Sequence, residues 1–211
     1  MDRVIDQIRE AFADLDFPGD VFLQGSFEGT EPFDVIAPFK GLRDWKVVDD
    51  AVLDANPEAL SFFSEAGFRF FLPAYLIADV KDKLQAADPL FHLTYGFYDS
   101  SVRLETTKGV LNKRFGRHSL LNPRRYGAIM SYDYARFRLS VFTREEARAI
   151  VAYLRYKRQW DTDGIHGKEI DAALESFWLD RAENAPERRM LTQHNREEEE
   201  FMRNIDGSLH G

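Results

Sequence analysis

The chain has 211 residues, 44% of them hydrophobic and 14% aromatic, so it can bury a sizeable core in one compact domain. It contains no cysteine, which excludes disulfide frameworks, thiolate metal sites and cysteine nucleophiles, and is compatible with a reducing compartment. The formal net charge of −8 argues against a protein whose whole surface attracts nucleic acid.

The N-terminal residues predict an amphipathic helix. Apolar side chains recur there at helical spacing, namely Val4, Ile5, Ile8, Ala11, Phe12 and Leu15. Phe17-Pro18-Gly19-Asp20 ends this helix, because proline and glycine do not extend the hydrogen-bond ladder. In residues 21–41, glycines and prolines surround short apolar runs, a pattern that favours a loop with one or two short strands.

A second helix is predicted over residues 45–55, with a restart at Asn56-Pro57. Ser64 is a candidate N-cap before the aromatic segment 68–76, whose sequence is FRFFLPAYL. Pro73 lies inside this segment and removes one helical hydrogen bond. We therefore expect a kink or a new start at Pro73, with the following helix running to about Ala86.

After Asp88-Pro89 the apolar residues alternate, which predicts a strand over residues 91–97. Residues 102–107 alternate as well, and the short connection at 98–101 favours an antiparallel hairpin between the two. Residues 108–126 show little periodicity and are expected to form a loop. A further alternation, in residues 137–141, predicts another strand.

Thr143 and Glu146 have the spacing of a capping box, which predicts a helix start at this point. A last helix is expected over residues 168–183. Together these elements predict an α+β fold, mainly helical with a small antiparallel sheet, in a single globular domain over residues 1–183. Residues 184–211 are expected to form a charged C-terminal tail that is either a weak helix or disordered.

Five segments occur here in an order that resembles an uncharacterised bacterial family, one of the domains of unknown function. They are Phe17-Pro18-Gly19-Asp20, Trp45, Ala59-Leu60-Ser61-Phe62, the aromatic segment 68–76, and the helix from Phe142-Thr143 through Leu154. The resemblance covers about Val4 to Tyr156 and implies no activity, ligand or catalytic residue. The arginine-rich stretch and the chain after Trp160 lie outside it.

Catalytic and cofactor motifs are not evident in the sequence. Gly25-Ser26-Phe27-Glu28-Gly29 lacks the Gly-x-Ser-x-Gly spacing of a nucleophile elbow. The glycine patterns that bind nucleotide phosphates are absent, and no two histidines have the spacing that places both on one helical face for zinc. The sequence therefore predicts no metal site, no cofactor and no catalytic set, although an enzyme with an unrecognised site stays open.

Arg69 and Tyr75, both in the aromatic segment, allow two interpretations. In the first, the Arg69 guanidinium binds an anion or a carboxylate, helped by the Tyr75 hydroxyl. In the second, which we favour, Arg69 pairs with an acidic residue of this chain or stacks on a neighbouring ring.

Positive charge is concentrated in residues 103–138, which hold nine of the 28 basic residues and only two of the 36 acidic ones. The candidate binding residues in this window are Arg103, Lys113, Arg114, Arg117, Arg124 and Arg125. Aromatic residues are interleaved with them, a composition found in proteins that bind single-stranded nucleic acid. The segment could equally dock on the acidic remainder of the chain, and a strand at Arg136-Phe137-Arg138-Leu139 would give an exposed basic strip.

These observations favour a non-enzymatic interaction protein whose partner is another protein, in an immunity-type or regulatory role in bacteria. The alternative is nucleic-acid or anionic-ligand binding through the basic segment 103–138. No stretch approaches the roughly 18 apolar residues of a membrane span, and the N-terminus lacks the pattern of a signal peptide. We therefore expect a cytoplasmic protein with no membrane partner.

Overall fold

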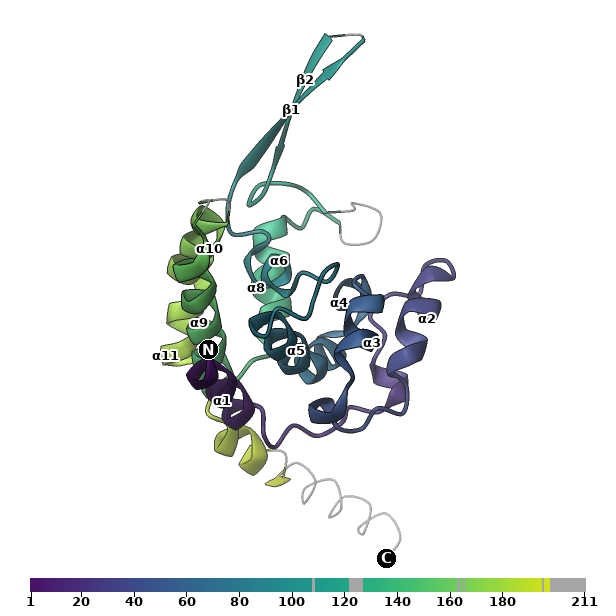
Figure 1. Cartoon of the computed structure of the whole chain (residues 1–211), viewed down its shortest axis with the longest axis vertical. Helices are drawn as coiled ribbons and strands as arrows, with labels where there is room; N and C mark the ends of the chain where they lie inside the picture. The colour runs from purple at the N-terminus through teal and green to yellow at the C-terminus, as the bar shows by residue number, and fades with distance from the viewer. Residues whose placement is uncertain (108, 122–126, 163, 165, 195, 198–211) are drawn as a thin grey trace, which may run out of the picture.

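The computed structural model describes residues 1–107, 109–121, 127–162, 164, 166–194 and 196–197. Helices gather round one central helix, α5, and a two-stranded hairpin projects from one end of this body (Figure 1). This arrangement confirms the α+β fold, mainly helical with a small antiparallel sheet. Among the described helices, none is long and apolar enough to cross a bilayer.

Helix α5 (Glu65–Val80) is buried on nearly every side. The Ser64 hydroxyl caps it by accepting a hydrogen bond from the Gly67 amide at 3.0 Å, as expected. The expected restart at Pro73 is wrong, because the helix continues through Pro73 and ends at Val80, short of Ala86. Proline inside a helix costs about 3 kcal/mol, and the burial of the surrounding aromatic and aliphatic side chains outweighs that cost.

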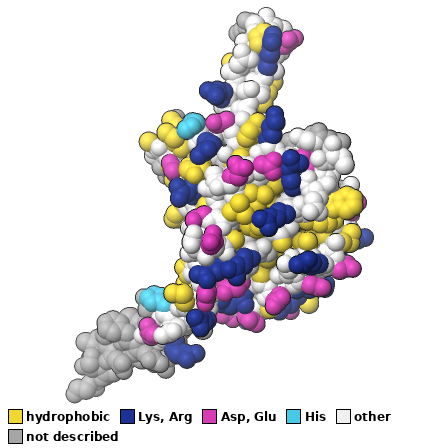
Figure 2. All heavy atoms as spheres, turned by 90° about the vertical axis from the view of Figure 1, so that its left-hand side faces the viewer, with side chains coloured by type: hydrophobic (Ala, Val, Ile, Leu, Met, Phe, Trp, Pro, Cys, Tyr) yellow, Lys and Arg dark blue, Asp and Glu magenta, His cyan; other side chains and the backbone are white. Residues whose placement is uncertain are grey.

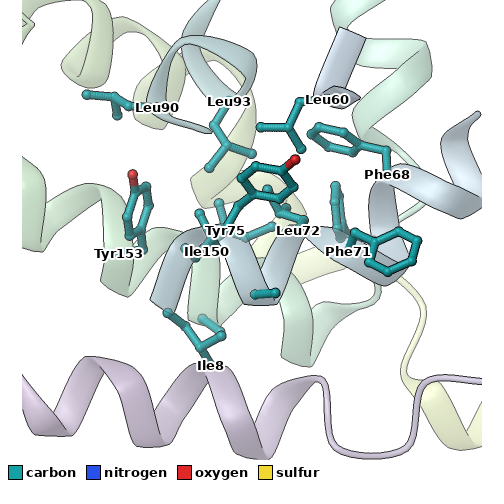
Figure 3. Packing of buried hydrophobic residues seen from close by; sticks show 14 of the residues in the cluster. Ile8, Leu60, Phe68, Phe71, Leu72, Tyr75, Leu90, Leu93, Ile150 and Tyr153 are labelled. Atoms are coloured by element: carbon teal, nitrogen blue, oxygen red, sulfur yellow. The ribbon is translucent and has the colours of Figure 1, made fainter. Parts of the chain in front are cut away.

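The core forms where other helices pack around α5. Figure 3 shows Phe68, Phe71, Leu72 and Tyr75 of α5 among side chains from several elements. These partners include Ile8 of α1 (Asp2–Ala11), Leu60 of α4 (Ala59–Phe62), Leu93 of α6 (Pro89–Thr94), and Ile150 of α9 (Arg144–Trp160). The aromatic segment 68–76 is therefore the centre of the core.

The N-terminal third is more helical than predicted. Helix α1 is confirmed, although it ends at Ala11. Residues 21–41 contain η1 (Asp20–Phe22), α2 (Glu31–Ile36) and η2 (Ala37–Phe39), and the described segment holds a single β-bridge, Gln24 to Phe63, where short strands were predicted. The predicted helix 45–55 is divided into η3 (Trp45–Val47) and α3 (Asp50–Ala55), because the Asp49 carboxylate caps Ala51 at 2.9 Å and begins a new helix.

Two of the three strands predicted after residue 88 are wrong. Residues 89–94 form α6, in which Asp88 caps the Phe91 amide at 3.0 Å and Pro89 occupies the first position. Residues 131–139 form α8 (Ser131–Leu139), whose buried Ser131, Ala135 and Leu139 recur every four residues. In both segments the apolar alternation was incidental, and the faces that pack on the body follow helical spacing.

The predicted strand at 102–107 is confirmed as β1 (Ser100–Thr106), but its partner is different. It pairs antiparallel with β2 (Gly109–Phe115), with Ser100 opposite Phe115 and Thr106 opposite Gly109. The prediction of a loop throughout residues 108–126 is therefore wrong for 109–115. Residues 108 and 122–126 lie outside the described part of the chain.

The capping box is confirmed, since the Thr143 and Glu146 side chains each bond the other residue's amide at the start of α9. The last predicted helix is confirmed as α10 (Gly167–Ala173), a π-helical turn η4 (Leu174–Trp178) and α11 (Leu179–Asn184). Beyond it, the Arg144 amide bonds the Pro186 carbonyl at 3.0 Å, and residues 188–194 are helical. The final residues, 198–211, lie outside the description.

Candidate interaction surface

The β1–β2 hairpin stands away from the helical body (Figure 1). Every described residue of both strands is exposed except Phe115, which is half-buried at the base. Within the described chain neither outer edge pairs with a third strand. A lone two-stranded hairpin is only marginally stable in water, and its free edges can hydrogen-bond another chain.

The strand register divides the hairpin into two unlike faces. One face carries Val102, Leu104 and Leu111, with Lys113 lying 4.8 Å from the centre of the Phe115 ring. Leu104 lies directly opposite Leu111, and these side chains are 48% and 53% exposed. We call this side of the hairpin the apolar face; it consists of Val102, Leu104, Leu111, Lys113 and Phe115.

The opposite face of the hairpin is mainly polar. It carries Arg103, Glu105, Asn112 and Arg114, together with Val110. The Arg103–Glu105 contact is 4.0 Å long between exposed side chains, so it contributes little stability. Figure 2 shows basic and hydrophobic side chains together along the projection. The hairpin thus combines apolar surface with a net positive charge.

The base of the hairpin is fixed by a close backbone approach. Gly116 has φ +128°, a conformation that favours glycine, and a Cβ here would collide with the Tyr98 carbonyl oxygen. The Gly116 amide donates to the Ser119 hydroxyl at 3.0 Å, and the Ser131 amide donates to the Ser119 carbonyl at 2.8 Å. These bonds join the end of β2 to the start of α8.

Two arginines flank Tyr132 beside this base. The Arg117 guanidinium lies 4.4 Å and the Arg136 guanidinium 5.5 Å from the centre of the Tyr132 ring. The ring is held in turn by an edge contact with Phe97, whose centre is 5.9 Å away. In the described part of the chain, neither arginine has a carboxylate within 4 Å. This Arg–Tyr–Arg group extends the positive charge of the hairpin onto the body.

The predicted basic residues are thus only partly together. Arg103, Lys113 and Arg114 are on the hairpin, Arg117 is at its base, and Arg124 and Arg125 lie outside the described residues. The expected exposed strip at 136–138 is wrong, because α8 is a helix and Arg138 turns inward. Its guanidinium bonds the Leu60 carbonyl and lies 4.5 Å from the Phe68 ring centre.

Arg69 and Tyr75 face different partners. Arg69 donates from Nε to Oε2 of Glu146 at 2.9 Å and from Nη2 to Oε1 at 2.6 Å. The Tyr75 hydroxyl donates to the Asn56 carbonyl at 3.2 Å, and its burial raises the pKa of Tyr75. Arg69 therefore pairs with an acidic residue of this chain, as the favoured interpretation expects, whereas Tyr75 bonds a different segment.

His92 is a pH-sensitive group that the sequence analysis did not single out. It packs between the Phe68 and Phe91 rings, with centres 6.3 and 5.3 Å away. Burial, together with the Arg138 charge, lowers the pKa of His92 from 6.5 to about 3. The unfolded chain therefore binds a proton here at a higher pH than the folded chain, so stability is full above pH 6.5 and is lost as the pH falls.

Lowering the pH from 7.5 to 5.5 is expected to cost about 1.4 kcal/mol of unfolding free energy through His92. Urea unfolding of the native chain and of His92→Gln at both pH values measures this effect, which the variant should lose. The exposed His118 supplies the control, because His118→Gln should keep the native pH dependence. If the unfolding free energies of the native chain and of His92→Gln depend equally on pH, His92 is not the group responsible for the loss of stability.

Comparison with known families identifies the group to which the chain belongs. A family model described as "Family of unknown function (DUF6714)" matches residues 1–182. The chain belongs to the DUF6714 family. No curated protein and no solved structure matches it. The DUF6714 match includes the arginine-rich stretch and continues past Trp160 to residue 182, so the expectation that these residues lie outside the family resemblance is wrong, whereas residues 183–211 do lie outside the match.

Proposed function

We propose that this chain is a non-enzymatic interaction protein, regulatory or immunity-type, that binds another protein in the bacterial cytoplasm through the β1–β2 hairpin. The observation that carries the proposal is the Leu104–Leu111 pair, which is half exposed on a hairpin whose strands pair only with each other in the described part of the chain. Apolar side chains gathered on one projection are typical of an interaction site. Scattered exposed leucines would not carry the same argument.

A bound partner would stabilise the hairpin in two ways. An apolar strip on the partner would bury the apolar face, at about 25 cal/mol for each Å² removed from water. A partner strand could also add to the free edge of β1 or β2, because backbone amides and carbonyls there have no ladder partner among the described strands. Both contributions favour an extended or β-rich partner segment.

The charge of the hairpin favours an acidic partner. Arg103 and Arg114 lie on the polar face, and Lys113 lies at the edge of the apolar face beside Phe115. Carboxylates around the partner's apolar strip would complement these charges and accelerate association. We therefore propose a partner surface with an apolar centre and an acidic rim.

A matched pair of substitutions on β2 tests this proposal. Leu111 and Val110 are neighbours with 53% and 51% exposure, but they lie on opposite faces. Leu111→Asp is expected to weaken partner binding by about tenfold or more, because it places a charge in the apolar contact. Val110→Asp should bind nearly as the native chain does.

The measurement is affinity capture from native lysate with the native chain and both variants, followed by size-exclusion chromatography of any complex. Support requires a stoichiometric partner that the native chain and Val110→Asp retain and Leu111→Asp loses. The proposal is overturned if both variants retain the partner equally, or if the native chain captures no stable partner from lysate at any salt concentration from low to high. Circular dichroism should show the same helical content in all three proteins.

A nucleic acid is the second candidate partner, favoured by the Arg117–Tyr132–Arg136 group, because bases stack on aromatic rings and arginine neutralises phosphate. Arg117→Gln with Arg136→Gln should then weaken binding to single-stranded DNA or RNA and reduce its salt dependence. The same double variant should leave protein binding through Leu111 nearly unchanged. Absence of a mobility shift at low salt eliminates this candidate.

A further inference from the structure

A pocket of about 340 Å³ lies on the body, against α5 and between α1, η3 and α3. None of its lining residues belongs to the hairpin, and none was singled out as a binding residue from the sequence. Its volume falls within the usual range for small-molecule sites, which are mostly apolar with a few polar groups.

The floor of the pocket is apolar and belongs to the buried helix α5. Ala74 and Ile77, one turn apart on α5, are 7% and 8% exposed, while neighbouring Tyr75, Leu76 and Ala78 are completely buried. Trp45 forms one wall, and its indole nitrogen donates to the Phe12 carbonyl at 3.1 Å. This bond fixes the ring beside the floor. A flat apolar group could therefore contact a surface that is already formed.

The rim of the pocket is predominantly basic. Arg9, Lys46 and Lys81 line it, with Asp50 as the one acidic lining residue among those described. Arg9 has a long, exposed contact of 3.9 Å with Asp6, which offsets little of its charge. Lys81 has no carboxylate within 4 Å in the described part of the chain.

Lys46 is held in position at this rim. Its ammonium donates to the Ala13 carbonyl at 2.7 Å and lies 5.8 Å from the centre of the Trp45 ring. An ammonium has three donors, so two remain for a ligand. The positive rim and the apolar floor together define the ligand that would fit.

We propose that this pocket binds a small anion that carries a flat apolar group, such as an aromatic carboxylate or an aryl phosphate. The apolar group lies on Ala74 and Ile77 beside Trp45, and the anionic group accepts hydrogen bonds from Lys46, Lys81 and Arg9. This site is independent of the hairpin, so the chain could bind a small molecule and a partner protein at separate places.

Phenyl phosphate and phenylacetate are suitable probes, because each combines a benzene ring with an anion. Their binding to the full chain can be followed by tryptophan fluorescence in a Trp160→Phe background, since Trp160 is 69% exposed and would add signal of its own. This background keeps Trp45 in the pocket wall and the completely buried Trp178, which should give a constant signal. We expect a saturable change with at least one probe, and the tighter probe identifies the preferred anion. Benzyl alcohol has the benzene ring without an anion, and inorganic phosphate is an anion without a ring. Each should bind at least about tenfold more weakly than the better probe.

Lys81→Gln and Lys83→Gln form the matched test pair. Both lysines are exposed and lie two residues apart, but only Lys81 lines the pocket. Lys81→Gln should weaken probe binding by roughly tenfold, the loss of one charge-assisted hydrogen bond, while Lys83→Gln should leave it unchanged. Arg9→Gln should also weaken binding.

Three results would overturn the pocket assignment. The first is the absence of a saturable change with either anionic probe up to millimolar concentration. The second is equal weakening by Lys81→Gln and Lys83→Gln, which would indicate a general charge effect. The third is equal affinity for benzyl alcohol, which would indicate an apolar site without anion recognition. None of these results bears on hairpin binding, because they concern a different surface.

Discussion

Replacing Glu146 by Gln is expected to lower the free energy of unfolding by about 3 kcal/mol. The Glu146 side chain is completely buried and accepts two hydrogen bonds from Arg69, and its Oε2 also accepts the Thr143 amide at 3.0 Å. Gln keeps the shape but removes the charge that compensates the Arg69 guanidinium. Because 1 kcal/mol shifts the melting temperature of a chain this size by about 2–4 °C, the expected decrease is about 6–12 °C.

The neighbouring Glu145 provides the control for this experiment. It lies in the same first turn of α9 but is less buried, and it accepts the Arg188 amide at 3.2 Å. Glu145→Gln should cost about 1 kcal/mol or less. The double variant Arg69→Met, Glu146→Leu should be more stable than Glu146→Gln, because it removes both charges together. If Glu146→Gln unfolds at the same urea concentration as Glu145→Gln, the ion pair does not stabilise the fold.

This ion pair shows which parts of the fold the sequence could predict. The capping box is local, since Thr143 and Glu146 are three residues apart, and its spacing alone predicted the start of α9. That Glu146 also binds Arg69 could not be predicted, because the two residues are 77 positions apart and any of the acidic residues could have paired with Arg69. Local bonds follow from spacing, whereas the identity of a distant partner requires the tertiary structure.

The errors at α6 and α8 have a related cause. Phe91 and Tyr95 alternate with other apolar residues, but both remain substantially exposed, and the side chains that pack inward are those spaced for a helix. Asp88-Pro89 supplied a helix-start signal that competed with the alternation. A short apolar run allows both interpretations, and packing against the body decides between them.

The hairpin was only partly predictable. Its basic residues and its first strand were identified, but β2 was expected to be a loop and the apolar face was missed. The local signal was only partial, because Leu111 and Phe115 lie on one strand face but the charged Lys113 between them interrupts the apolar alternation. The basic pocket had no such signal, since Arg9, Lys46 and Lys81 come from separate segments that only the packing of α1 and η3 on α5 brings together.

Tyr75→Ala is expected to cost about 3–5 kcal/mol of unfolding free energy, the usual result of truncating a large buried aromatic residue. Tyr75 is completely buried at the centre of α5, among Phe68, Leu72 and Ile150 (Figure 3). Truncation leaves a cavity that surrounding helices cannot fill without moving. Urea unfolding followed by circular dichroism measures the loss, and the melting temperature should fall by at least 6 °C or so.

Tyr75→Phe separates the ring from its hydroxyl. It removes only the bond to the Asn56 carbonyl, which is 3.2 Å long, so it should cost about 1 kcal/mol. If Tyr75 instead served an anion site with Arg69, Tyr75→Phe would leave stability unchanged and weaken ligand binding. A small stability loss for Tyr75→Phe beside a large one for Tyr75→Ala would identify the ring as part of the core and leave the hairpin and the basic pocket as the binding surfaces. Unchanged stability together with weaker ligand binding in Tyr75→Phe would return the search for function to α5.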